Sequence, residues 1–215
     1  MVRGYLIALL LAAYPVLAPA PPGRVQQNIT AYLTGEGMSS RWQVVTSKKL
    51  AGKMMGKTPV YQWTLSIYAP PDGDRARLAF RSPGLSDLVP AVQRAANAQM
   101  YFPLEDVKIA GTAQLERAAV DDVVVVTHAA GADCGTATVS IIGADPNGNV
   151  SVRHQLQNYC DLKAQIVHEG RRDAVRLTGA YYAHNSPVCC PAKPRVTAML
   201  RYRNGQWIVT PRYFK

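Results

Sequence analysis

The sequence predicts an α+β fold, built mostly of antiparallel β-strands with one main helix and a disulfide-stapled C-terminal sheet. Three observations predict this class. Several segments alternate apolar and polar residues with the period of a half-buried strand. Turn-forming sequences such as Asn204-Gly205 separate neighbouring segments at the spacing of hairpins. The four cysteines all lie in the C-terminal half of the chain, where bonds between them would hold one sheet.

The chain begins with the features of a secretion signal. Arg3 gives a positive start, residues 4–17 form a nearly unbroken apolar run, and Ala18-Pro19-Ala20 has the small-x-small form of a cleavage site. The run is shorter than the ~20 apolar residues that a membrane span needs. We therefore expect residues 1–20 to be a signal peptide and the protein to be periplasmic or secreted. Pro21 follows the expected cleavage site and fits poorly there, so the point of cleavage stays open. Alternatively, the segment is not cleaved and is the protein's only contact with the membrane.

Residues 21–117 are predicted to form an N-terminal α+β part. Residues 60–68 and 75–81 alternate apolar and polar side chains on either side of a turn at Pro71-Asp72-Gly73-Asp74, which predicts a pair of strands. Residues 85–100 instead repeat apolar side chains at helical spacing, with Ser86 as the N-cap, and predict the main helix. A further alternating strand is expected over 107–115.

Residues 118–215 are predicted to form a C-terminal β part. The run of four valines from Val123 to Val126 is typical of a central strand buried on both faces. Three hairpins follow, with their turns at 145–148, at 169–173 and at Asn204-Gly205. The register of the last hairpin pairs Tyr202 with Trp207, Leu200 with Val209, and Val196 with Tyr213.

The last hairpin is predicted to have one apolar face and one basic face. No acidic residue follows Asp173, so this end of the chain is uniformly positive and attracts anionic partners. We expect the partner to be an anionic envelope polymer or an acidic protein, and no specific nucleic acid. The predicted binding residues are Arg195, Arg201, Arg203 and Arg212 on the basic face, with Tyr181, Tyr182 and His184 near the loop that the cysteines would hold.

The cysteines are interpreted as structural staples, because the sequence has no Cys-x-x-Cys pair. Folding about Asn147 places Cys134 roughly opposite Cys160. Each of these cysteines could form a disulfide bond with one member of the adjacent pair Cys189-Cys190, and each bond would attach the loop at 184–194 to a strand. Alternatively, Cys134 bonds to Cys160 and the adjacent pair is bonded to itself or free. A zinc site is the third alternative, although zinc ligands are normally spaced by two to four residues.

The run Leu177-Thr178-Gly179-Ala180-Tyr181-Tyr182, followed by Ser186-Pro187-Val188-Cys189-Cys190-Pro191, resembles the LppP/LprE-type envelope proteins of bacteria. Those proteins carry a tyrosine-containing strand, a polar loop and a Cys-Cys-Pro triplet before a basic terminal hairpin. Asp133-Cys134-Gly135 matches their upstream cysteine, and the resemblance covers residues 121–215. This chain departs from the pattern because it lacks the lipobox cysteine that many members carry. The resemblance implies an exported envelope protein and supplies no catalytic residue.

The sequence contains no motif that is typical of a particular enzymatic reaction. It has no Gly-x-Ser-x-Gly elbow, phosphate-binding loop, dinucleotide fingerprint or His-Glu-x-x-His helix. Asp121-Asp122 are interpreted as the solvated start of a strand. We therefore predict a non-enzymatic, exported envelope protein without cofactor or metal. The alternatives are a periplasmic hydrolase that joins His128, His154 or His168 with a carboxylate, and a structural accessory subunit of an envelope complex.

Overall fold

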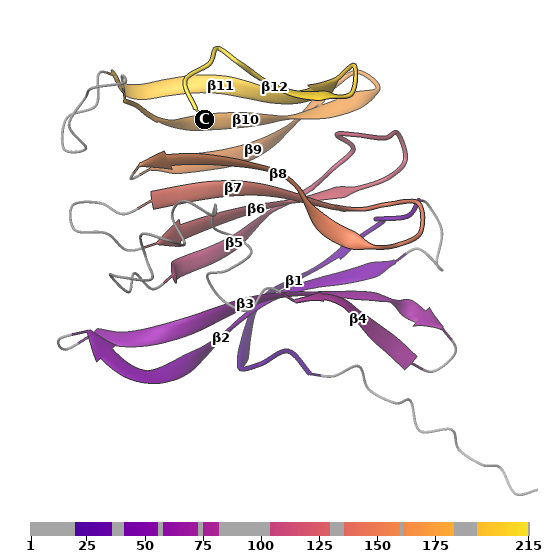
Figure 1. The fold of residues 1–215 in the computed structure, drawn as a ribbon, viewed down its shortest axis with the longest axis vertical. Helices are drawn as coiled ribbons and strands as arrows, with labels where there is room; N and C mark the ends of the chain where they lie inside the picture. Colours follow the sequence, from indigo (N-terminus) through magenta and orange to yellow (C-terminus); the bar gives the residue numbers. More distant parts are fainter. Residues whose placement is uncertain are drawn as a thin grey trace, which may run out of the picture.

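The described part of the protein is a stack of three antiparallel β-sheets (Figure 1). The structure is a computed structural model, and it describes residues 20–35, 41–55, 58–72, 75–81, 104–129, 136–159, 161–182 and 193–214. Within each sheet, every strand pairs with the next strand along the chain, so each sheet is a meander of hairpins.

Each sheet has four strands. The N-terminal sheet contains β1 (Arg24–Ala31), β2 (Trp42–Met55), β3 (Thr58–Asp72) and β4 (Arg75–Arg81). The central sheet contains β5 (Leu104–Ala113), β6 (Asp122–Ala129), β7 (Thr136–Ala144) and β8 (Val150–Tyr159). The C-terminal sheet contains β9 (Leu162–Glu169), β10 (Arg172–Tyr181), β11 (Lys193–Arg203) and β12 (Gln206–Thr210).

The expected α+β class is wrong, because the fold is all-β and contains no helix among the described residues. The prediction depended on the helical spacing of apolar residues over 85–100, a range that lies outside the described residues. Most of the described residues form strands, including β1 and β2, which the sequence patterns did not indicate. Both precede the first strongly alternating segment, and their apolar residues are interspersed with glutamine, serine, threonine and lysine.

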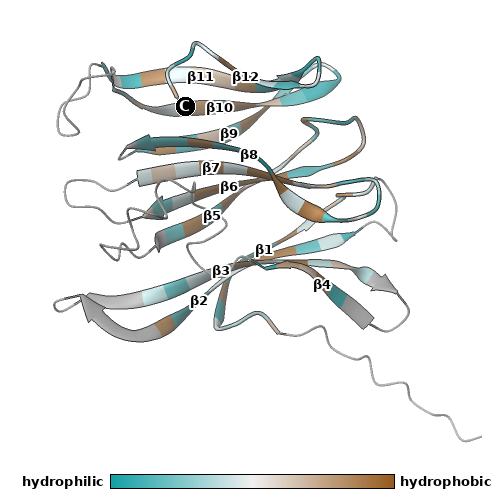
Figure 2. Ribbon diagram, in the orientation of Figure 1, coloured by the Kyte–Doolittle hydropathy of each residue, from teal (hydrophilic) through white to brown (hydrophobic). Residues whose placement is uncertain are grey.

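The central sheet is buried on both faces, because a sheet packs against each of them. On β6, Val123 and Val125 contribute to the core beneath the N-terminal sheet, while Val124 and Val126 contribute to the core beneath the C-terminal sheet. Every residue of β7 is buried. The prediction of a strand buried on both faces is therefore confirmed. Figure 2 shows hydrophobic residues running through this middle layer.

Two separate cores hold the stack together, and large aliphatic side chains fill both. Burial of each such side chain contributes about 1.5–3 kcal/mol to folding. The first core contains Trp42, Val44, Leu65, Ile67, Val107, Ile109 and Ile142. The second core contains Leu115, Ile141, Leu156, Leu162, Leu177 and Leu200.

The predicted hairpins of the C-terminal half are confirmed. Ala144 pairs with Val150 around the turn at 145–148. In the last hairpin, Tyr202 pairs with Trp207 and Leu200 with Val209. Asn204 and Gly205 have φ values of 51° and 78°, the two positive values that a type I′ turn requires. The expected pairing of Val196 with Tyr213 is wrong, because β12 ends at Thr210.

Several predicted features lie outside the described residues. They are residues 1–19 of the expected signal peptide, the four cysteines and His184. The predicted boundary between residues 117 and 118 falls between β5 and β6, which pair within the central sheet. Among the described residues, no helix has the length and apolar character needed to cross a membrane.

Candidate anion-binding surface

The outer face of the C-terminal sheet is set by the register of its strands. Val175 and Leu177 on β10 point into the second core. Arg176, between them, therefore points outward. It lies opposite Met199 on β11 and opposite Gln165 on β9. Alternate residues of these three strands therefore share an outer face that no other described sheet covers.

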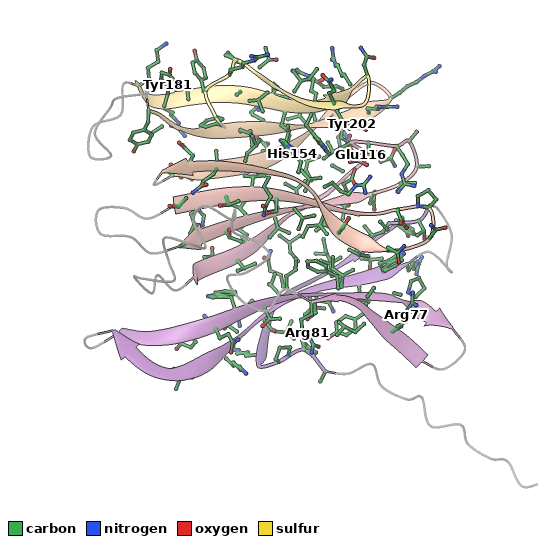
Figure 3. All side chains as sticks on the ribbon, in the orientation of Figure 1. Arg77, Arg81, Glu116, His154, Tyr181 and Tyr202 are labelled. Carbon is green, nitrogen blue, oxygen red and sulfur yellow. The ribbon has the colours of Figure 1, made fainter. Side chains whose placement is uncertain are left out.

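Cationic side chains dominate this outer face. Lys163, Arg176, Arg195 and Arg203 are exposed, and Arg201 is partly buried. Uncharged polar residues such as Thr178 and Thr197 lie between them. In Figure 3 the outward side chains of this sheet project from the top of the stack. We call this surface the basic face and define it as Lys163, Arg176, Arg195, Arg201 and Arg203.

One of the predicted arginines is already paired with a carboxylate. The Arg201 guanidinium donates two hydrogen bonds to Glu169, of 2.7 Å from Nε and 2.6 Å from Nη2. These bonds hold the pKa of Glu169 below its usual range. Arg203 is more exposed, and its Nη2 lies 3.9 Å from the same carboxylate. Arg195, Arg203 and Arg212 are exposed as predicted, whereas Arg201 is largely neutralised by Glu169.

A groove of about 650 Å³ opens at one end of the basic face. The β9–β10 turn supplies one wall and the β11–β12 turn supplies the other. The lining residues are Glu116, Glu169, Arg171, Arg172, Asp173, Arg201, Tyr202, Arg203, Asn204 and Gly205.

The carboxylates of the groove all have partners within the protein. Glu116 accepts a hydrogen bond of 3.0 Å from Arg153 Nη2, and Glu169 accepts the two bonds from Arg201. Asp173 accepts a bond of 2.8 Å from the Gln114 backbone N–H and contacts His168 Nδ1. By contrast, Arg171 and Arg172 form no ion pair with any described residue. The groove can therefore offer free guanidinium groups to an anion, and its negative charges are already satisfied.

Stacked rings hold the β11–β12 hairpin against β8. Tyr202 meets Trp207 at a ring distance of 5.0 Å and an angle of 61°. Trp207 in turn stacks on His154 at 5.1 Å and 9°. Burial lowers the pKa of His154, so the ring is neutral at pH 7. Figure 3 shows His154, Tyr202 and Glu116 at the same end of the stack.

Tyr181, one of the two tyrosines singled out from the sequence, lies at the opposite end of the C-terminal sheet from Tyr202 (Figure 3). Tyr181 packs against Tyr213 at a ring distance of 5.1 Å, and Lys193 Nζ lies 5.5 Å from the Tyr213 ring. Tyr181 and Tyr182 are both partly buried. Tyr181 therefore serves the packing of this sheet and is separate from the groove.

Asp122 is buried, which the interpretation of a solvated strand start did not anticipate. Its side chain lies against Gly143 of β7, and Oδ2 accepts a bond of 3.2 Å from the Glu116 backbone N–H. Burial, reinforced by the charge of Glu116, raises the pKa of Asp122 to about 7. Its neighbour Asp121 joins two sheets instead, since it accepts a bond of 2.8 Å from the Tyr32 backbone N–H.

The described histidines are not gathered into a catalytic or metal site. His154 stacks on Trp207, and His168 contacts Asp173 at the exposed β9–β10 hairpin. His128 lies on β6 opposite Ala137. In the part of the chain that the structure describes, no group of three or more histidine, cysteine or acidic residues could hold a metal ion. The His168–Asp173 contact is a pairing of histidine and carboxylate of the kind that the hydrolase alternative named, and that alternative stays a prediction.

Comparisons with protein-family models, with curated proteins and with solved structures find no match to this chain. Its functional interpretation therefore depends on its own residues and geometry.

Proposed function

We propose that this protein is an exported, non-enzymatic envelope protein that binds an anionic polymer through the basic face and the adjoining groove. One observation carries the proposal. The carboxylates next to these cations are bonded within the protein, whereas Arg171, Arg172, Arg176 and Arg195 have no acidic partner among the described residues. Exposed cations without internal partners attract anions over a distance of ~10 Å at 0.1 M salt.

The layout of the basic face favours a polymer over a small anion. Arg195 and Arg203 both belong to β11, and the rise of a strand places their backbones roughly 26 Å apart. A single phosphate or carboxylate cannot reach both guanidinium groups. A chain with repeated negative charges can contact them together, and it can also enter the groove at the Arg203 end.

The proposed location follows from sequence features rather than from the sheets. Residues 1–20 have the form of a secretion signal, and the Cys-Cys-Pro motif resembles that of LppP/LprE-type envelope proteins. Export is tested by fusing residues 1–30 to a reporter that is active only outside the cytoplasm. The fusion should be active, and Leu10→Arg should abolish its activity. An inactive reporter with the intact segment would refute export.

Binding is tested with delipidated lipopolysaccharide, a soluble phosphate-bearing polysaccharide. The test variant carries Arg176→Gln, Arg195→Gln and Arg203→Gln. The control variant carries Arg41→Gln, Arg77→Gln and Lys108→Gln, three exposed cations outside the C-terminal sheet. Both variants lose the same charge, so a difference between them reports position. We expect at least tenfold weaker binding for the test variant only, and weaker binding of the parent as salt rises.

Equal loss in the two variants would show that only net charge matters. Unchanged binding by a folded test variant would refute the proposal outright. Surface substitutions of this kind usually change stability by less than ~0.5 kcal/mol, so thermal unfolding should confirm that both variants are folded.

A further inference from the structure

The hairpin of β2 and β3 extends beyond the strands that flank it. β1 pairs with β2 only as far as Lys48, and β4 pairs with β3 only from Ser66 onward. The β2–β3 ladder nevertheless continues through Leu50 and Tyr61 to the pair Met55 and Thr58. Residues 48–55 and 58–63 thus form a two-stranded ribbon whose edges pair with no other described strand beyond Lys48. Figure 1 shows this hairpin reaching past the central sheet.

The ribbon leaves apolar side chains uncovered. Trp63 and Leu65 point toward the first core, and Tyr61 lies on the same side of β3. Tyr61 is 39% exposed and its cross-strand partner Leu50 is 60% exposed. The apolar face of the N-terminal sheet therefore continues outward past the last residues that the central sheet covers.

Cationic side chains accompany this apolar face. Lys48 Nζ lies 5.0 Å from the centre of the Tyr61 ring and 5.3 Å from that of Trp63. Lys49 is exposed. The sequence has no acidic residue over positions 37–71. The ribbon thus combines exposed apolar groups, an aromatic ring and uncompensated ammonium groups.

We propose that this ribbon docks onto an anionic lipid bilayer. Leu50 and Tyr61 enter the headgroup region, where aromatic rings with a polar end are favoured. Lys48 and Lys49 bind lipid phosphates, and each cation near an anionic surface strengthens binding about fivefold. The positive charge of the ribbon favours an anionic bilayer over a neutral protein surface. The ribbon belongs to the N-terminal sheet, so the inference is independent of the basic face on the C-terminal sheet (Figure 1).

The test measures how the full chain partitions onto vesicles of phosphatidylglycerol with phosphatidylcholine, compared with vesicles of phosphatidylcholine alone. The readout is the ratio of the two partition coefficients, because the apolar N-terminal segment would contribute to both. Lys48→Gln with Lys49→Gln should lower the ratio about 25-fold, on the fivefold scale per cation. The matched control, Arg77→Gln with Lys108→Gln, removes the same charge from exposed positions outside both the ribbon and the basic face and should change the ratio much less.

The apolar contribution is tested with Leu50→Ser and Tyr61→Ser together, against Ile208→Ser. Ile208 is also 39% exposed but lies on the C-terminal sheet. Partitioning onto anionic vesicles should fall at least tenfold for the ribbon variant and remain near the parent value for the control. Equal partitioning of parent and ribbon variants would overturn the proposal. Self-association of the parent without lipid, lost in the ribbon variant, would also overturn it and assign the ribbon to a second copy of this chain.

Discussion

Replacing Asp122 by asparagine should make the protein more stable at neutral and alkaline pH. Asp122 is 3% exposed, and burial raises its pKa from an ordinary value of 3.8 to about 7. Between these two pH values, the unfolded chain releases the proton while the folded protein keeps it. The free energy of unfolding therefore decreases as pH rises from 4 to 7, and it is independent of this group above pH 7.

The size of this effect follows from the pKa difference. The difference between these two pKa values corresponds to about 4 kcal/mol, which is an upper bound for this carboxyl. Asparagine carries no charge at any pH, and its side-chain oxygen can still accept the Glu116 N–H bond, which is 3.2 Å long in the parent. The Asp122→Asn variant should therefore lose the decrease in stability that the parent shows between pH 4 and 7.

Urea denaturation of the parent and of Asp122→Asn at pH 4, 5, 6, 7 and 8 measures this difference. The other ionisable groups are common to both proteins, so their contributions largely cancel. The advantage of the variant should grow by up to about 4 kcal/mol from pH 4 to pH 8. A difference that stays constant over this range would refute the reasoning, whether the variant is more or less stable overall.

Three further predictions concern the cores, the basic face and the cysteines. Ile141→Ala and Ile142→Ala should each lower the free energy of unfolding by about 2–5 kcal/mol in chemical denaturation, because these neighbours fill different cores; tolerance of either change would contradict the three-layer packing. Glu169→Gln should free Arg201 and tighten binding of delipidated lipopolysaccharide, whereas unchanged or weaker binding would show that the freed guanidinium is not used. In the parent, the ion pair stabilises the folded protein above the ordinary pKa of Glu169, and this stabilisation is lost as pH falls and Glu169 takes up a proton. Glutamine does not titrate, so the Glu169→Gln variant should lack this part of the pH dependence. Non-reducing peptide mapping should find no free thiol, and the peptides that contain Cys134, Cys160 and Cys189-Cys190 should form one linked species that reduction separates. Four free thiols or bound zinc would contradict the predicted disulfides.

Local patterns in the sequence were sufficient to predict the C-terminal hairpins. Asn204-Gly205 fixes a two-residue turn, and the turn fixes which residues of β11 and β12 face each other. The valine run of β6 likewise indicates burial on both faces, because neither face of residues 123–126 carries a polar side chain. These features depend on neighbours within a few residues, so a single sequence contains them.

Features that depend on contacts between hairpins could not be predicted in this way. The bond between Arg201 and Glu169 joins side chains 32 residues apart, and no turn specifies how β9 aligns with β11. The burial of Asp122 likewise depends on groups that meet only in the folded protein, among them the Glu116 backbone N–H and Gly143 of β7. The groove combines the turns of two hairpins with Glu116 from the connection between β5 and β6, so no local sequence motif predicts it.

Chemical protection of arginines tests the central claim most directly, because it locates the bound polymer without changing the protein. Phenylglyoxal modification, read by mass spectrometry with and without delipidated lipopolysaccharide, reports each guanidinium separately. We expect protection of Arg171, Arg172, Arg195 and Arg203, with no change at Arg41 and Arg77 of the N-terminal part. Protection spread evenly over all exposed arginines, or confined to Arg41 and Arg77, would contradict it.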